Sequence, residues 1–146
     1  MKKLLYVVLA LLGIGMQTAC ADNDRPITTD QLPAKALAFL GEQFPNDAVS
    51  YATMDKELFS TTYEVVLASG TRVEFLSSGE WSEIDCRHNA LPEVVVPQPI
   101  REQVAQRFPD RVMTEIKRER GRHEVTISGG LELKFDARNQ LVEIDD

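Results

Sequence analysis

Residues 62–85 read TYEVVLASGTRVEFLSSGEWSEID, and this stretch determines the expected fold. Apolar and polar residues alternate over about 62–68, 71–76 and 80–85, which is the period of half-buried β-strands. Ser69-Gly70 and Ser78-Gly79 interrupt the alternation with residues that favour tight turns. Because the connections are so short, neighbouring strands are expected to pair antiparallel as hairpins.

A weaker version of this pattern returns in the C-terminal half and indicates an internal duplication. The matching segments are Glu64-Val65, Phe75 and Glu83-Ile84-Asp85, which recur as Glu124-Val125, Phe135 and Glu143-Ile144-Asp145. Further strands are predicted at about 49–54, 111–119, 122–128, 131–136 and 140–144. The distance along the chain from Phe44 to Glu64 in the first copy is four residues longer than the matching distance from Phe108 to Glu124 in the second. The extra residues are expected in the first hairpin, around 55–61.

A helix with one apolar stripe is predicted at the start of each copy, because apolar residues recur there every fourth position. Prolines stand where each helix should begin and directly after the last stripe residue, where they end it. The stripes are Ala36, Leu40, Phe44 and Ile100, Val104, Phe108, and the prolines are Pro33, Pro45, Pro97 and Pro109.

The predicted fold class is therefore α+β, a tandem duplication of a helix followed by a four-stranded antiparallel sheet. We expect a signal peptide at 1–21, a first repeat at 22–86, a linker at 87–95 whose polar, turn-like part at 87–92 acts as a short hinge, and a second repeat at 96–146. The sequence leaves open whether the two sheets join into one continuous curved sheet with the helices on one face. Units of about 60 residues are marginally stable alone, which favours packing together.

The alternation assigns side chains to the two faces of the sheet. The face toward the helices should carry Tyr63, Val65, Leu67, Val73, Phe75, Ile84, Val125, Ile127, Leu133, Phe135 and Ile144. The open face should carry Glu64, Val66, Arg72, Glu74, Trp81 and Glu83, and then Glu124, Thr126, Glu132, Lys134, Leu141 and Glu143. Trp81 is placed there by its match to Leu141. The alternative is that strand twist or the longer hairpin of the first copy buries this ring.

The N-terminus has the three-part layout of a secretory signal: Lys2-Lys3, an apolar stretch over 4–15, and small residues up to Ala21. The apolar stretch is shorter than the roughly 20 residues that span a bilayer, so we predict cleavage rather than an integral membrane span. Cleavage after Ala21 competes with lipid attachment at Cys20. Gln17 stands where a lipoprotein signal prefers an aliphatic residue, so cleavage after Ala21 is favoured. The lipoprotein alternative stays open.

The formal charge of −7 becomes −9 for residues 22–146, since Lys2 and Lys3 are removed and no acidic residue precedes Asp22. Such an acidic chain repels phosphate backbones, so nucleic acid is not an expected partner. Only Cys86 remains after cleavage, which excludes an internal disulfide. We expect Cys86 to be a half-buried apolar residue, with an intermolecular disulfide as the alternative.

No catalytic residues, metal site or cofactor are predicted, because the sequence lacks HExxH, CxxC, Gly-x-Ser-x-Gly and a phosphate loop. His88 falls in the polar linker, and His123 takes the place of Tyr63 and is expected to pack on the sheet. Carboxylates on the open face could do acid–base chemistry or bind Ca²⁺. Alternating charges on a wet strand face are more often simple solvation.

Several segments together carry a family pattern. They are Leu32-Pro33, Phe44-Pro45, Thr62-Tyr63-Glu64-Val65-Val66, Val73-Glu74-Phe75, Gly79-Glu80-Trp81, Gly130-Leu131-Glu132-Leu133 and Ile144-Asp145-Asp146. The chain resembles the β-lactamase-inhibitor-like, PepSY-like family of secreted proteins from Bacteroides-type bacteria. The resemblance implies tandem helix-plus-four-strand units and a curved sheet like that of inhibitors that grip β-lactamase, and no inhibitory residue is carried over.

The sequence thus favours an exported, non-catalytic periplasmic or secreted module that recognises an envelope protein or peptide, with inhibitor-like action suggested by the resemblance. The alternative is a small-ligand-binding protein or hydrolase that uses the carboxylate-bearing sheet face. The predicted binding residues on the open face are Trp81, Glu64, Arg72, Glu74, Glu83, Glu124, Lys134 and Glu132.

Overall fold

The structure is a computed structural model that describes residues 23–146. The predicted signal peptide and the alternative lipid site at Cys20 lie outside the described residues. Among residues 23–146, no helix combines the length and apolar character needed to cross a membrane.

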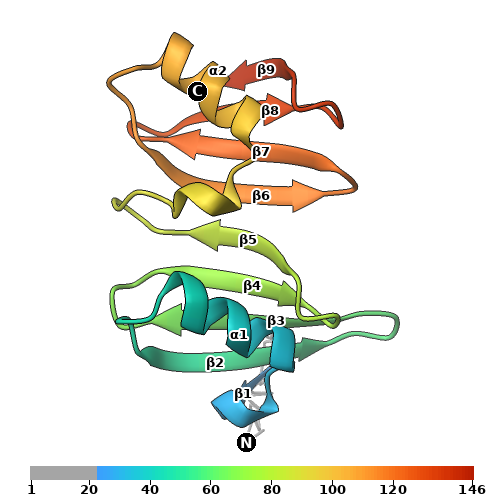
Figure 1. The fold of residues 1–146 in the computed structure, drawn as a ribbon. Coiled ribbons are helices and arrows are strands. Elements are labelled where there is room, and N and C mark those ends of the chain that lie inside the picture. The colour runs from blue at the N-terminus through green and yellow to red at the C-terminus, as the bar shows by residue number, and fades with distance from the viewer. Residues whose placement is uncertain (1–22) are drawn as a thin grey trace, which may run out of the picture.

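Two α-helices and nine strands make up the described chain (Figure 1). The first half holds β1 (Asp24–Ile27), α1 (Ala34–Gln43), β2 (Val49–Lys56), β3 (Thr61–Leu67), β4 (Arg72–Leu76) and β5 (Trp81–Asp85). The second half holds α2 (Gln98–Arg107), β6 (Met113–Glu119), β7 (Arg122–Ile127), β8 (Leu131–Phe135) and β9 (Leu141–Asp145). Short 3₁₀ turns, Thr29–Gln31 and Glu93–Val95, precede the two helices.

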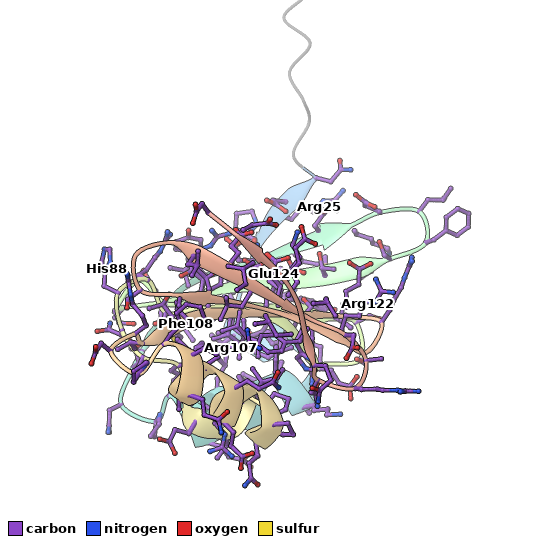
Figure 2. The ribbon with its side chains drawn as sticks, turned by 90° about the horizontal axis from the view of Figure 1, so that it is seen from above. Arg25, His88, Arg107, Phe108, Arg122 and Glu124 are labelled. Carbon is purple, nitrogen blue, oxygen red and sulfur yellow. The ribbon has the colours of Figure 1, made fainter. Side chains whose placement is uncertain are left out.

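All strands pair antiparallel with their neighbours in chain order, which gives one nine-stranded sheet. The halves join where β5 pairs with β6, with Ile84 opposite Ile116. The two sheets expected from the sequence are therefore one continuous sheet, and both helices lie on the same side of it (Figures 1 and 2). The helix followed by four strands occurs in the same order in each half, while the common origin of the halves stays a prediction.

Both helices begin and end where the prolines predict. Pro33 and Pro97 are the N-cap residues, and Phe44 and Phe108 close the last turns by donating their N–H groups to the carbonyls of Leu40 and Val104. Strand β1 was not predicted from the sequence. It is a four-residue edge strand that contains Pro26, and an edge position tolerates the missing N–H group.

A single hydrophobic core runs along the helix side of the whole sheet. Phe75 is 0% exposed and Phe135 is 1% exposed, as the face assignment predicts. Ile144 is an exception at 46% exposed, because β9 is the edge strand and has a neighbour on one side only. Cys86 is a free thiol and is more deeply buried than expected, so its side chain offers no surface for an intermolecular disulfide.

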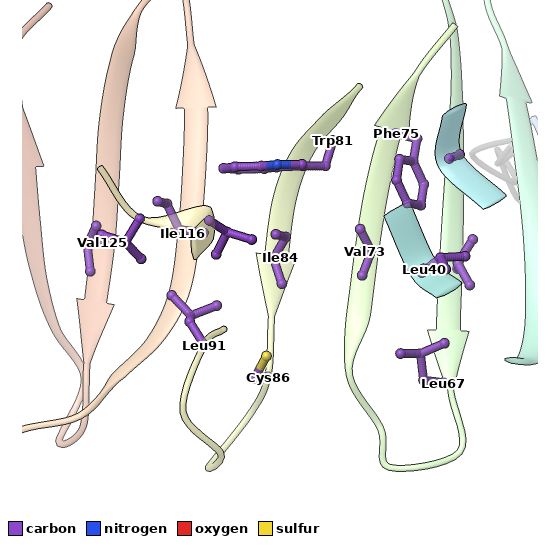
Figure 3. Close-up of a cluster of buried hydrophobic side chains, with 14 of the residues drawn as sticks. Leu40, Leu67, Val73, Phe75, Trp81, Ile84, Cys86, Leu91, Ile116 and Val125 are labelled. Atoms are coloured by element: carbon purple, nitrogen blue, oxygen red, sulfur yellow. The ribbon is translucent and has the colours of Figure 1, made fainter. Parts of the chain in front are cut away.

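The segment at 87–95 is packed rather than hinge-like. Leu91 and Val95 are buried in the core, and the Leu91 N–H group donates a 2.9 Å hydrogen bond to the carbonyl of Met113 in β6. Figure 3 shows Leu91 beside Ile116. The prediction of a polar hinge is therefore wrong, because Leu91 packs into the core beside the β5–β6 junction and its backbone is hydrogen-bonded to β6.

The predicted open-face position of Trp81 is also wrong. Glu74 pairs with Glu83, but the next residue along β4, Phe75, pairs with Trp81, so Ser82 is the extra residue of a β-bulge. A bulge reverses the alternation beyond it. The Trp81 ring therefore turns to the helix side, where it is 8% exposed and lies in the buried cluster (Figure 3).

The second half has a bulge at the corresponding place. Lys134 pairs with Glu143 and Phe135 pairs with Leu141, which leaves Val142 as the extra residue. Leu141 is consequently packed against the core, and Val142 is 63% exposed. The match between Trp81 and Leu141 is thus kept, but both side chains lie on the face opposite to the one predicted.

Candidate functional site

The sheet surface opposite the helices, called here the open face, carries seven of the eight residues predicted for binding. Figure 2 shows Glu124 on this side of the sheet, away from Arg107 at the end of α2 and from Phe108, which follows it. Each of these residues alternates with a core residue on its strand and is only partly buried. The seven residues are Glu64, Arg72, Glu74, Glu83, Glu124, Glu132 and Lys134.

Strand register places charged residues directly opposite one another across the open face. We call this line, one residue from each of β3 to β9, the central row. Adjacent strands lie about 4.8 Å apart, so neighbours in the row are within reach of one another. The central row is Glu64, Glu74, Glu83, Lys117, Glu124, Lys134 and Glu143.

A second row runs parallel to the first, two residues along each strand and therefore roughly 7 Å away. It begins at the half-exposed ring of Tyr51 in β2 and ends at Asp145 in β9. The second row is Tyr51, Val66, Arg72, Asp85, Glu115, Thr126, Glu132 and Asp145.

The two rows together are strongly acidic. They contain nine carboxylates against three basic side chains, Arg72, Lys117 and Lys134. Each base is already paired: the Arg72 guanidinium contacts Glu64 at 2.5 Å, and the Lys134 ammonium contacts Asp145 at 2.6 Å. The open face therefore presents an excess of negative charge to anything that approaches it.

Lys117 lies at the middle of this face, where the two halves meet. Its Nζ atom lies 3.1 Å from a Glu115 oxygen and 4.0 Å from a Glu83 oxygen. Burial alone would lower the pKa of Lys117, but the hydrogen bond to Glu115 and the surrounding carboxylates outweigh it and raise that pKa. Lys117 is therefore held in its charged form.

Glu83 has a pKa above its ordinary value of 4.5. Burial is the main cause, the negative charges of Glu115 and Glu74 add to it, and Lys117 acts in the opposite direction. Glu74 is held in place because its Oε1 atom accepts a 2.7 Å hydrogen bond from the Ser82 hydroxyl. The carboxylates of β4 and β5 thus form a crowded acidic centre on the open face.

Lys134 holds the last two strands together at the far edge. Its ammonium group donates to Glu143 at 3.2 Å and to Asp145 at 2.6 Å. The hydrogen bond from Lys134 lowers the pKa of the Asp145 carboxyl, and the same two bonds raise the pKa of Lys134. These charges keep β9 in register at a sheet edge that lacks a further strand.

Residues 23–146 contain no group of three or more His, Cys, Asp or Glu side chains placed to hold a metal ion. His123 packs on the sheet as predicted, and burial followed by the charge of Arg118 lowers its pKa. His88 is exposed in the turn after β5.

Two shallow depressions indent the surface. One of about 700 Å³ lies over the ends of β6 to β9 and includes Lys117, Glu124 and Lys134. The other, of about 630 Å³, includes His88, Asp85 and Glu115. Glu83, the carboxyl with the raised pKa, lines neither of them. The acidic centre around Glu83 thus lies outside both depressions.

Besides Tyr51, sequence reasoning missed four charged members of the rows, Asp85, Glu115, Lys117 and Asp145. Their faces follow from the same parity rule once Ile84 and Ile116 are recognised as core residues. What the sequence did not show is that β5 and β6 pair, which places Lys117 opposite Glu83.

Comparison with known proteins agrees with this architecture. The family profile described as "Putative beta-lactamase-inhibitor-like, PepSY-like" matches residues 61–143. No curated protein matches the chain. A crystal structure from Bacteroides vulgatus, of a "putative periplasmic protein" of the DUF2874 family, is 38% identical with a TM-score of 0.82, and the match covers 86% of this chain and 99% of that one.

Two further crystal structures are similar. A "putative calcium-regulated periplasmic protein" from Bacteroides thetaiotaomicron is 36% identical with a TM-score of 0.82, and the match covers 86% of this chain and 99% of that one. A second protein from Bacteroides vulgatus, described as periplasmic and of unknown function, is 34% identical with a TM-score of 0.81, with 84% and 99% covered. The fold and the matched residues together show that the chain belongs to the β-lactamase-inhibitor-like, PepSY-like family.

Proposed function

We propose that this chain is an exported, non-catalytic protein that binds another protein or a peptide through the open face of its sheet. The observation that carries the proposal is the alignment of charged residues across seven adjacent strands, from Glu64 to Glu143. The helices cover one side of the sheet and leave the other side open (Figure 2). A large charged face of this kind is typical of a surface that selects a partner by complementary charge.

The size of the open face suits a protein partner. Nine strands at about 4.8 Å spacing give a width of roughly 38 Å. A stable protein–protein interface buries about 800 Å² on each side, which such a face can supply. The excess of carboxylates over bases favours a partner that presents lysine or arginine side chains.

The family description supports an inhibitor-like role, in which the bound protein is an enzyme whose surface the sheet covers. The similar Bacteroides proteins are described as periplasmic, which supports export of this chain to the same compartment. We further propose that the two halves arose by duplication, since each contains a helix followed by four strands, with a bulge at the last strand.

Site-specific photo-crosslinking in the native envelope tests which face meets a partner. A benzoylphenylalanine residue is placed at Glu74 on the open face or, as the matched control, at exposed Glu42 on α1. We expect a defined crosslinked product from position 74 and none from position 42. Crosslinking from position 42 alone would show that the helix side is the binding surface and would contradict the proposal.

A further inference from the structure

The hairpin between β2 and β3 ends in two apolar side chains that the fold leaves in solvent. Leu58 is 87% exposed and Phe59 is 95% exposed, and no other large apolar side chain in residues 23–146 is as exposed as these two. Scattered exposed apolar residues are ordinary, but two adjacent ones at the tip of a projecting loop form a patch that water solvates poorly. Packing of the core therefore does not explain why the tip carries Leu58 and Phe59.

The tip is held in a defined shape. The strand pairing continues to Lys56 opposite Thr61, and the Glu57 N–H group then donates a 2.9 Å hydrogen bond to the Ser60 carbonyl. Leu58 and Phe59 are the two residues between this closing pair. An anchor that is already ordered loses less conformational entropy when it enters a partner than a flexible loop does.

The corresponding hairpin of the second half shows that the fold does not require an apolar tip. That hairpin, between β6 and β7, turns at Arg120 and Gly121, whose φ angles of 51° and 79° suit a tight two-residue turn. Beyond the strand pair Arg118–His123, this hairpin has only residues 119–122. Beyond the corresponding pair Met54–Tyr63, the first-half hairpin has residues 55–62 and is therefore longer. Figure 1 shows both tips at the same end of the sheet, with the β2–β3 tip reaching farther out. The longer hairpin carries its apolar pair into solvent, where both side chains are almost fully exposed.

We propose that Leu58 and Phe59 form an anchor that enters an apolar pocket on the protein bound by the open face. This inference rests on the proposed function and names one feature of the partner, a pocket for an aromatic ring. The tip is continuous with the open face, since the cross-strand pair Thr53 and Glu64 lies five residues, or roughly 17 Å, back along the same hairpin. A partner that covers Glu64 can therefore reach Phe59.

Charge favours a protein over a lipid surface as the occupant. The residues that lead into the tip, Asp55, Lys56 and Glu57, carry more negative than positive charge, and the adjoining open face is acidic. Anionic headgroups repel such a surface. Two apolar side chains are also few for a stable membrane anchor, whereas a single aromatic in a protein pocket, ringed by weaker contacts, can dominate binding.

The test uses the mature protein and the partner crosslinked from position 74, each purified, with affinity measured by calorimetry. Phe59→Ala is expected to raise Kd at least about tenfold with an unchanged melting temperature. Val94→Ala, which trims another exposed apolar side chain, is the matched control and should leave Kd unchanged. Phe59→Leu should keep part of the affinity, because an apolar side chain still fills the pocket.

The outcomes separate this inference from the proposed function. If Phe59→Ala binds like the wild type while Glu74→Lys weakens binding, the anchor is disproved and the open-face proposal stands. If neither variant changes Kd, both are disproved. Cosedimentation with vesicles of phosphatidylcholine and phosphatidylglycerol tests the lipid alternative: no binding is expected, and binding that Phe59→Ala abolishes would overturn the assignment of a protein pocket.

Discussion

The guanidinium carbon of Arg118 lies 3.9 Å from the centre of the Trp81 ring, and Arg118 Nε donates a 2.6 Å hydrogen bond to the Trp81 carbonyl. Trp81 belongs to β5 and Arg118 to β6, so this contact joins the two halves of the chain at their only direct strand pairing in the described residues. A cation stacked on an aromatic ring adds electrostatic attraction to the burial of the ring. Trp81 is therefore a structural residue of the junction.

Replacing Trp81 by alanine should destabilise the fold by about 3–5 kcal/mol, because it leaves a cavity in the core and removes the stacking partner of Arg118. Trp81→Phe keeps most of the apolar volume and should cost clearly less. Urea unfolding followed by circular dichroism measures both. A neutral Trp81→Ala variant would contradict the assignment of this ring to the core.

Phe75 and Phe135 should be equivalent core positions in the two halves. Both are fully buried, and each lies opposite the strand residue just before a bulge. Changing either to alanine should cost about 3–5 kcal/mol, and the two losses should be similar. If one variant melts like the wild type, the packing described for that half of the core is wrong.

Much of the fold can be predicted from the alternation of apolar and polar residues. That alternation assigns Val65, Val73, Val125 and Leu133 to the core, where each is 0% exposed. It fails at Trp81 because a bulge at Ser82 adds one residue that no local sequence signal marks. The sequence also does not predict that Leu91 and Val95 are buried. They stand in an otherwise polar segment, and the core that they enter depends on the long-range pairing of β5 with β6.

The sequence predicts most of the residues on the open face but not how they align from strand to strand. Parity places Glu64, Glu74 and Glu83 on one face, yet their alignment with Lys117 depends on the pairing of β5 with β6, a long-range contact. The exposure of Phe59 could not be predicted from the sequence. Only its position at a hairpin tip, with no element packed over it, leaves the ring in solvent.

Replacing Glu83 by glutamine should stabilise the protein at pH 7. The folded pKa of Glu83 is raised above its ordinary 4.5, chiefly by burial, so the folded state holds this proton more tightly than the unfolded state. Ionisation therefore costs stability as pH rises above about 4.5, and glutamine avoids that cost.

Melting temperatures across a pH series measure this effect. Glu83→Gln should melt above the wild type at pH 7, and the difference should disappear below the ordinary glutamate pKa. The same exchange at exposed Glu42 is the control and should change little. A Glu83→Gln variant that is less stable at pH 7 would show that its attraction to Lys117 outweighs its burial.

The N-terminus of the protein made in cells should be Asp22, since the residues before Cys20 fit lipid attachment poorly. Intact mass spectrometry of the protein purified from its native cells measures this directly. A species that begins at Cys20 and carries the mass of a diacylglycerol group would instead place the protein on a membrane surface.

The open face as a binding surface is tested most directly by the affinity of the purified partner for one charge-reversed variant. Glu74→Lys relieves repulsion with Glu64 and Glu83, so it should leave the melting temperature unchanged or higher. It should nevertheless raise Kd by at least about tenfold, because it reverses a charge at the acidic centre. Glu42→Lys, with the same charge change on α1, should bind like the wild type. Equal Kd values for the two variants would contradict the assignment of binding to the open face.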